Sequence, residues 1–162
     1  MKTAFKHISG FITIFGLLFF LTGFAGHRDQ FGYSVKSRQT ALINQSLDPA
    51  KVDARGKVIS GRWVCPYTGT ETTLVAALQG DHVVPLEWAW IHGADQWTAE
   101  KRKQFANDQE NILIVLSTVN GEKGERGPDQ WLPPNVSFRP AYVEKFAHIV
   151  EKYGLKEESQ LL

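Results

Sequence analysis

The 162-residue sequence contains a single cysteine, Cys65, and this scarcity excludes two kinds of structure. An intrachain disulfide needs two thiols, and structural zinc sites built from several cysteines are excluded as well. We expect the Cys65 thiol to be a small buried hydrophobic group on a strand, with an intermolecular disulfide as the alternative.

The sequence also lacks a large excess of charge of either sign. It has 18 Lys and Arg side chains against 17 Asp and Glu, a formal net charge of +1. Two of the lysines, Lys2 and Lys6, lie in a predicted leader, and without them 16 basic side chains face 17 acidic ones, a net charge of −1. This balance excludes a polycation that coats nucleic acid, so any contact with nucleic acid must come from a local patch.

Internal repeats and low-complexity segments are also absent. The sequence is instead 43% hydrophobic and 12% aromatic, with five tryptophans that we expect to lie mostly in the core, and this composition argues against disorder. Its length is enough for one domain with a hydrophobic core and too short for two.

One long apolar run is present, at the N-terminus. Lys2 and Lys6 precede an apolar stretch over residues 11–21, and Gly23 and Ala25 follow it, which predicts a signal peptide over residues 1–25. The alternative is an uncleaved membrane anchor, because the uncharged stretch is nearly long enough to span a bilayer. Both interpretations predict export: a secreted or periplasmic protein, or a membrane-anchored one that faces outward. A membrane is a partner only if the leader is uncleaved.

Behind the leader, we expect residues 26–56 to form a connector and a helix over 37–47, residues 57–155 to form one domain, and residues 156–162 to form a polar tail. Composition and turn residues predict extended segments at 57–65, 74–78, 82–84 and 112–116. Capping residues predict helices that begin at Pro85, at Thr98 and at Arg139, with Gly93 ending the first and Gly154 ending the last.

Polar residues with catalytic potential occur at Asp81-His82 and again at Asn120. An imidazole titrates near neutral pH, so His82 can take a proton from water. A carboxylate and an amide oxygen suit Mg²⁺ or Mn²⁺ better than Zn²⁺. Successive strand residues point to opposite faces, so we expect a twist or bulge at Gly80 to bring Asp81 and His82 to one phosphate. Alone, the pair could equally be a turn with local hydrogen bonds.

The order of five sequence blocks resembles the HNH endonucleases of the ββα-metal fold, and more narrowly a secreted branch with a DUF1524-like domain. The blocks are Gly61–Gly69, Asp81–Leu86, Ala106–Asp108, Asn120–Gly124 and Pro128–Pro134, and the resemblance covers residues 61–155. It implies an α+β fold with a ββα-metal core and flanking helices. It also implies an exported endonuclease that hydrolyses phosphodiester bonds of DNA, with RNA as an alternative substrate, and leaves 5′-phosphate ends.

The same resemblance assigns roles to particular residues. It makes His82 the general base and makes Asp81 and Asn120 the ligands of one divalent cation, for which we expect Mg²⁺. Sequence specificity should be low, because no recognition helix or zinc-finger module is evident, and no protein partner is predicted.

Three further residues complete the implied site. Asn111 would brace a loop through backbone hydrogen bonds, and Lys123 and Arg126 would face the phosphate backbone. The sequence departs from the family pattern at Gly80, where an apolar or acidic residue is common, and at Glu125, which replaces an Asp.

The alternative function is a non-catalytic nucleic-acid-binding module on the same scaffold. Such a module would bind DNA with a strong dependence on salt and show no turnover. The presence of all the proposed catalytic residues argues against it.

Overall fold

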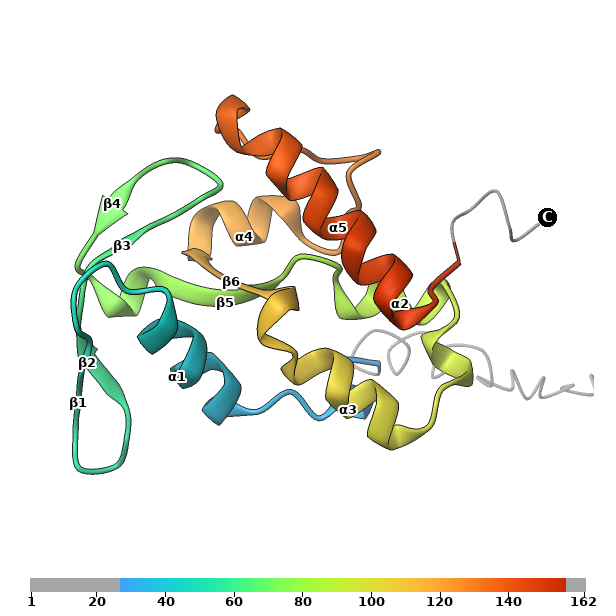
Figure 1. The fold of residues 1–162 in the computed structure, drawn as a ribbon, viewed down its shortest axis with the longest axis horizontal. Coiled ribbons are helices and arrows are strands. Elements are labelled where there is room, and N and C mark those ends of the chain that lie inside the picture. The colour runs from blue at the N-terminus through green and yellow to red at the C-terminus, as the bar shows by residue number, and fades with distance from the viewer. Residues whose placement is uncertain (1–26, 157–162) are drawn as a thin grey trace, which may run out of the picture.

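The structure is a computed structural model that describes residues 27–156 (Figure 1). The predicted signal peptide or anchor at 1–25 lies outside the described residues, as does the predicted tail beyond Lys156. Within the described part, no helix is long and apolar enough to cross a membrane.

The described chain is an α+β fold with three two-stranded antiparallel sheets. The α-helices are α1 (Val35–Asn44), α2 (Leu86–Ile91), α3 (Ala99–Asn107), α4 (Ser117–Lys123) and α5 (Arg139–Tyr153). The strands are β1 (Lys51–Val52), β2 (Val58–Ser60), β3 (Trp63–Val64), β4 (Glu71–Thr72), β5 (Leu78–His82) and β6 (Ile112–Leu116). Short 3-10 helices lie between them: η1 (Arg28–Phe31), η2 (Val75–Ala77), η3 (Ala94–Gln96), η4 (Gln109–Asn111) and η5 (Val136–Phe138).

The centre of the fold is the antiparallel pair of β5 and β6, which α4 follows directly. In this register Asp81 pairs with Leu113 and His82 pairs with Ile112. Helix α4 begins at Ser117, one residue after β6 ends. In the sequence, α2 and α3 separate β5 from β6. In the fold, β5, β6 and α4 nevertheless form one ββα unit, whose first strand ends in Asp81 and His82 (Figure 1).

The two faces of this strand pair are covered by different helices. Helix α1 packs on one face, where Ile112 and Ile114 join a buried cluster with Leu42 and Trp63. The other face carries Val115 and meets α4 and α5. The two-residue period of β6 therefore divides its side chains between two cores, as expected for a strand buried on both sides.

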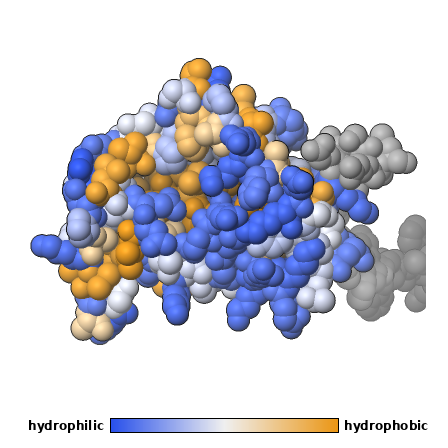
Figure 2. Space-filling view, viewed as in Figure 1, coloured by the Kyte–Doolittle hydropathy of each residue, from blue (hydrophilic) through white to orange (hydrophobic). Residues whose placement is uncertain are grey.

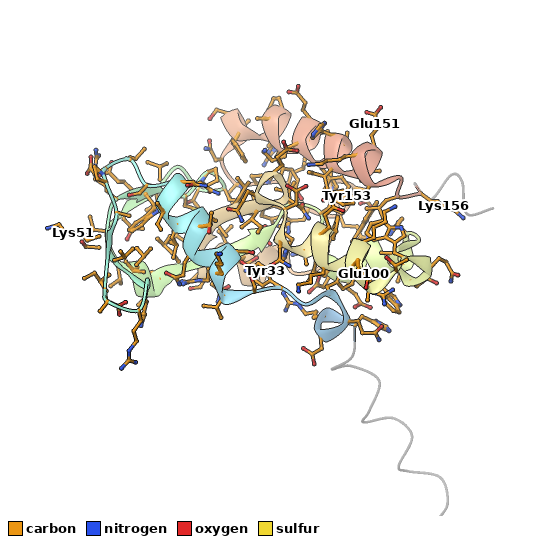
Figure 3. All side chains as sticks on the ribbon, turned by 60° about the horizontal axis from the view of Figure 1, so that its bottom comes forward. Tyr33, Lys51, Glu100, Glu151, Tyr153 and Lys156 are labelled. Carbon is orange, nitrogen blue, oxygen red and sulfur yellow. The ribbon has the colours of Figure 1, made fainter. Side chains whose placement is uncertain are left out.

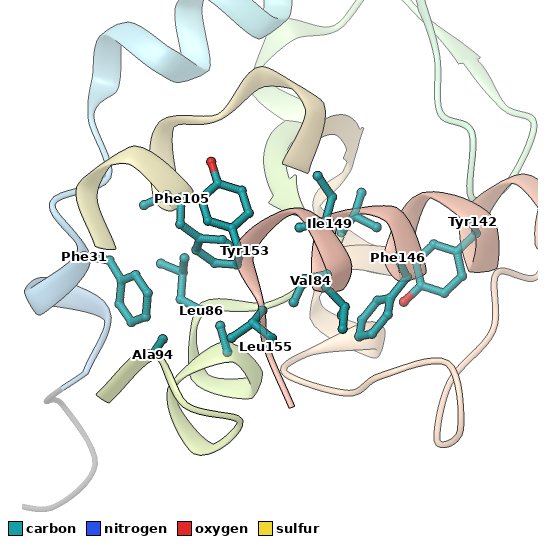
Figure 4. Packing of buried hydrophobic residues seen from close by; sticks show 14 of the residues in the cluster. Phe31, Val84, Leu86, Ala94, Phe105, Tyr142, Phe146, Ile149, Tyr153 and Leu155 are labelled. Atoms are coloured by element: carbon teal, nitrogen blue, oxygen red, sulfur yellow. The ribbon is translucent and has the colours of Figure 1, made fainter. Parts of the chain in front are cut away.

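The larger core is rich in aromatic residues and extends along α5 (Figure 4). Tyr142, Phe146, Ile149 and Tyr153 project from α5 at three- and four-residue spacing, as the sequence predicts, and they are buried. Phe31 of the connector is fully buried in the same cluster. The N-terminal connector is thus packed into the body that contains the nuclease-like sequence. Of the tryptophans, only Trp63 is fully buried, and the other four pack against the larger core while partly exposed.

Most predicted helix ends are confirmed. The Thr98 side chain caps α3 by accepting a hydrogen bond from the Lys101 amide. Gly93, at φ 115°, follows α2, and Gly154, at φ 64°, ends α5. Both glycines adopt backbone angles that other residues rarely take. Pro85 precedes α2 as its N-cap residue instead of lying within its first turn.

Three of the predicted extended segments are wrong in detail. The segment 57–65 is divided into β2 and β3, which pair with different partners. The division falls at Gly61, where a Cβ would lie 2.4 Å from the Trp63 ring. Within the predicted segment 74–78, Val75–Ala77 form the 3-10 helix η2, and within 82–84 only His82 belongs to a strand, because β5 runs without a break from Leu78 to His82. Cys65 is buried as expected, immediately after β3.

The two hairpins β1–β2 and β3–β4 lie at one end of the molecule (Figure 1). Apolar side chains on both are exposed, including Val52, Ile59 and Val64. In the space-filling view, apolar surface lies at this end and also along the upper part of the molecule, while the lower right part is largely hydrophilic (Figure 2).

Candidate active site

Two adjoining cavities open beside the end of β5. The first, of about 410 Å³, is lined by Asp81, His82 and Asn120 together with other polar residues. The second, of about 390 Å³, is lined by Tyr33 and Asp29 and also by His82. His82 forms part of both walls, so the two cavities adjoin at this residue. The fold thus brings Asp81, His82 and Asn120 together at one cavity.

This meeting does not need the irregularity that we expected at Gly80. The pairing of β5 with β6 proceeds without a register shift through Gly80, Asp81 and His82. Both residues line the first cavity at the end of the strand, with the Asp81 carboxylate against Lys123 of α4 and the His82 ring against Tyr33.

The Asp81 carboxylate is buried in a network of charge and hydrogen bonds. Its Oδ1 accepts a hydrogen bond from the Lys123 ammonium at 2.9 Å, and its Oδ2 accepts one from the Tyr67 hydroxyl at 2.7 Å. Lys123 also donates to the His82 carbonyl at 2.8 Å. Burial, followed by the Asp81 charge, raises the pKa of Tyr67 well above its usual value, so this hydroxyl keeps its proton and donates it.

Lys123, which we expected to face the phosphate backbone, lines neither cavity in the structure. The residue is 0% exposed, and its ammonium is used by Asp81 and by a backbone carbonyl. The reason is its position on α4: Lys123 lies four residues after Val119, so both project from the face of the helix that is turned to the core. Arg126 is exposed and its Nε donates to the Lys123 carbonyl at 3.0 Å, but it does not line either cavity.

The His82 imidazole is held in one tautomer. Its Nε2 lies 2.7 Å from the Ala106 carbonyl oxygen, and because a carbonyl only accepts, Nε2 must carry the proton. In the neutral ring Nδ1 is then the unprotonated nitrogen. Burial lowers the pKa of His82 to about 4, against the opposing effects of the Ala106 hydrogen bond and the Asp81 charge. The ring is therefore neutral at neutral pH, with Nδ1 available as a base.

Asn111 is fully buried and makes no contact with the cavities. Its Oδ1 accepts from the Val84 amide at 2.9 Å, and its Nδ2 donates to the Val84 carbonyl at 3.2 Å. Its own carbonyl accepts from the Val83 amide. These are contacts that a bracing residue would make, and they tie the segment after His82 to the start of β6.

The oxygen atoms on the first cavity are suited to a magnesium-type cation. Asn120 donates through Nδ2 to Gln79 Oε1 at 2.8 Å, which leaves its own amide oxygen as an acceptor. Each Asp81 oxygen has one protein donor and can accept a second bond. Between residues 27 and 156 there is no group of three or more His, Cys, Asp or Glu side chains that could hold a metal. A cation here would therefore take two protein oxygens and complete its shell with water or substrate, as Mg²⁺ usually does.

The basic side chains on the first cavity were not among the predicted site residues. They are Arg28 of η1 and Arg38 of α1. Arg38 donates through Nη2 to the Leu78 carbonyl at 2.8 Å. The Arg28 side chain is 69% exposed, with its Nε 3.8 Å from a Glu125 carboxylate oxygen. Neither belongs to a sequence motif, and both precede β5 by 40 residues or more, so only the folded chain reveals them.

Comparison with known proteins places most of the chain in a family. Residues 34–160 match the family described as GmrSD restriction endonucleases, C-terminal domain. A curated relative, an uncharacterized secreted protein of Arthroderma benhamiae, is 36% identical over 125 residues, which are 76% of this chain and 61% of the relative. The chain therefore spans less than two thirds of that relative's length. No solved structure matched the chain.

Replacing Lys123 with alanine should destabilise the fold by about 3–5 kcal/mol, because the Asp81 carboxylate would stay buried without its counter-ion. Arg126→Ala is the matched control. It removes a cation from an exposed side chain three residues away and should change the free energy of unfolding by about 0.5 kcal/mol or less. Urea unfolding of both variants measures the difference, and equally small effects would contradict the buried ion pair.

Proposed function

The chain belongs to the family of the C-terminal domain of GmrSD restriction endonucleases, and from this premise we propose that it is an exported, metal-dependent endonuclease that hydrolyses phosphodiester bonds of DNA. The family match supports a nuclease-related function and a nucleic-acid substrate. The predicted leader, and a relative that is described as secreted, support export.

The observation that carries the proposal is the arrangement around His82. His82, whose Nε2 is held protonated so that Nδ1 is the basic nitrogen, lines both cavities, and Asp81 and Asn120 line the first of them with it. The unit formed by β5, β6 and α4 has the order of elements of a ββα-metal core. Together with the sequence blocks that resemble the HNH endonucleases, this order supports that narrower class.

In the proposed reaction His82 Nδ1 removes a proton from water while the water oxygen forms a bond to phosphorus. The bond from phosphorus to the 3′ oxygen breaks, and the leaving oxygen takes the bonding pair and a proton from solvent, which leaves a 5′-phosphate end.

Two groups neutralise the charge that develops on the phosphoryl oxygens. Arg28 and Arg38 are the cationic side chains on the wall of the first cavity, and we assign to them the phosphate contacts that the sequence had suggested for Lys123 and Arg126. Asp81 and Asn120 would hold one Mg²⁺, which supplies further neutralisation of the phosphate when bound. Sequence specificity would be low, because the sequence shows no recognition helix or zinc-finger module to read base edges.

Incubation of supercoiled plasmid with the purified protein tests the proposal. Nicking and linearisation should require Mg²⁺ or Mn²⁺, stop in EDTA, and fall by at least about a hundredfold in His82→Ala, because the general base is removed. Plasmid that stays intact in every condition would refute the nuclease. If that intact plasmid were retarded on a gel in a salt-sensitive way, the chain would be a nucleic-acid-binding module instead.

The role assigned to Arg28 predicts a change in salt dependence. Arg28→Gln should reduce the slope of log K against log salt for duplex DNA by about 0.9, the value for one phosphate contact. Arg55→Gln is the control, because Arg55 is also exposed but lies in the turn between β1 and β2, outside both cavities. Binding measured by fluorescence anisotropy in EDTA avoids cleavage during the titration. Identical slopes for the two variants would show that Arg28 does not contact phosphate.

A further inference from the structure

Tyr33 lies beside the proposed general base but belongs to no sequence motif. It is in the segment between η1 and α1, just before the part of the chain that matches the family (Figure 3). Its ring packs edge-on against the His82 imidazole, with 4.8 Å between the ring centroids and 72° between the planes. Tyr33 also lines the second cavity, together with His82 and Arg28.

The Tyr33 hydroxyl is buried and has no hydrogen-bond partner among residues 27–156. This is unusual, because a buried hydroxyl normally finds an acceptor. The contrast with Tyr67 is direct, since the Tyr67 hydroxyl donates to Asp81. Burial raises the pKa of Tyr33, so its hydroxyl keeps its proton at neutral pH and is available as a donor.

The strand beneath Tyr33 leaves space for this hydroxyl. A Cβ at Gly80 would lie 2.6 Å from the Tyr33 hydroxyl oxygen, closer than such atoms approach, while the next neighbour, Ile112, would be at 3.5 Å. Glycine at position 80, where the sequence departs from its family, is therefore explained by the hydroxyl above it. The ring and the strand together fix a donor within the site that the free protein does not use.

We propose that the Tyr33 hydroxyl donates a hydrogen bond to a non-bridging phosphate oxygen of the nucleic acid. The inference rests on the proposed nuclease function and adds a substrate contact to it. A strand that crosses from the first cavity to the second passes His82 and then the wall formed by Tyr33. A phosphate oxygen that enters the second cavity supplies the acceptor that the hydroxyl lacks, so this contact forms only with substrate bound.

Tyr33→Phe and Tyr142→Phe form a matched pair for the test. The Tyr142 hydroxyl is also buried without a partner among the described residues, but Tyr142 lies on α5 and lines neither cavity. Neither substitution should lower the melting temperature, because each removes an unsatisfied polar group. Tyr33→Phe should reduce kcat/KM for plasmid cleavage by about tenfold to a hundredfold, the loss expected for one hydrogen bond to a charged group. Tyr142→Phe should stay within about twofold of the wild type.

A second pair separates contact with substrate from packing. Gly80→Ala should lower the melting temperature by several degrees, and adding Tyr33→Phe should restore it, because the collision with the hydroxyl oxygen is removed. The double variant should cleave no faster than Tyr33→Phe alone. If the wild type cleaves plasmid and Tyr33→Phe cleaves it within about twofold of the same kcat/KM, the proposed Tyr33 contact is overturned but the nuclease function is not. A wild-type protein that cleaves nothing under any metal would overturn the nuclease proposal and the Tyr33 contact with it.

Discussion

The buried ion pair between Asp81 and Lys123 is the interaction on which the arrangement of the site depends. It joins the end of β5 to α4, and through Tyr67 and the His82 carbonyl it also ties in the turn after β3 and the backbone of the proposed base. Two charges that are removed from water are tolerated only when their partners are close and their hydrogen bonds are made. Movement of α4 away from β5 would break this network, so the requirement for a stable fold also fixes the wall of the cavity.

The same pair changes how the charge of the site is distributed. Lys123 neutralises the carboxylate that we propose as a metal ligand. Because its ammonium is already paired, we assign it no contact with the substrate. The positive charge that reaches the first cavity comes from Arg28 and Arg38, which the fold brings from the N-terminal part of the chain. In a chain with almost no net charge, a contact with nucleic acid must come from such locally placed cations. The N-terminal segment is accordingly part of the site, with Phe31 as its anchor in the core.

Sequence reasoning located the elements whose signals are local and missed contacts that depend on packing. The cap at Thr98, the glycine after α5 and the apolar segment of β6 were predictable because each depends on near neighbours in the chain. Asp81, His82 and Asn120 could be expected at one site from an ordered motif. The burial of Lys123 could not, since α4 is only seven residues long and too short for its buried face to show in the sequence. Tyr33 and Arg28 carry no local signal at all, because their importance comes from contacts with residues more than 40 positions away.

The central claim is that the fold holds His82 as a neutral base, with Nε2 protonated and Nδ1 free at the cavity. Long-range ¹H–¹⁵N NMR spectra of the histidine imidazoles test this directly, with His82 assigned by its loss in His82→Ala. The account predicts that His82 is the Nε2–H tautomer at neutral pH and stays neutral to well below the usual pKa of histidine, because burial lowers its pKa to about 4. A His82 ring that is protonated at Nδ1 at neutral pH, whether as the other tautomer or as the imidazolium ion, would contradict it.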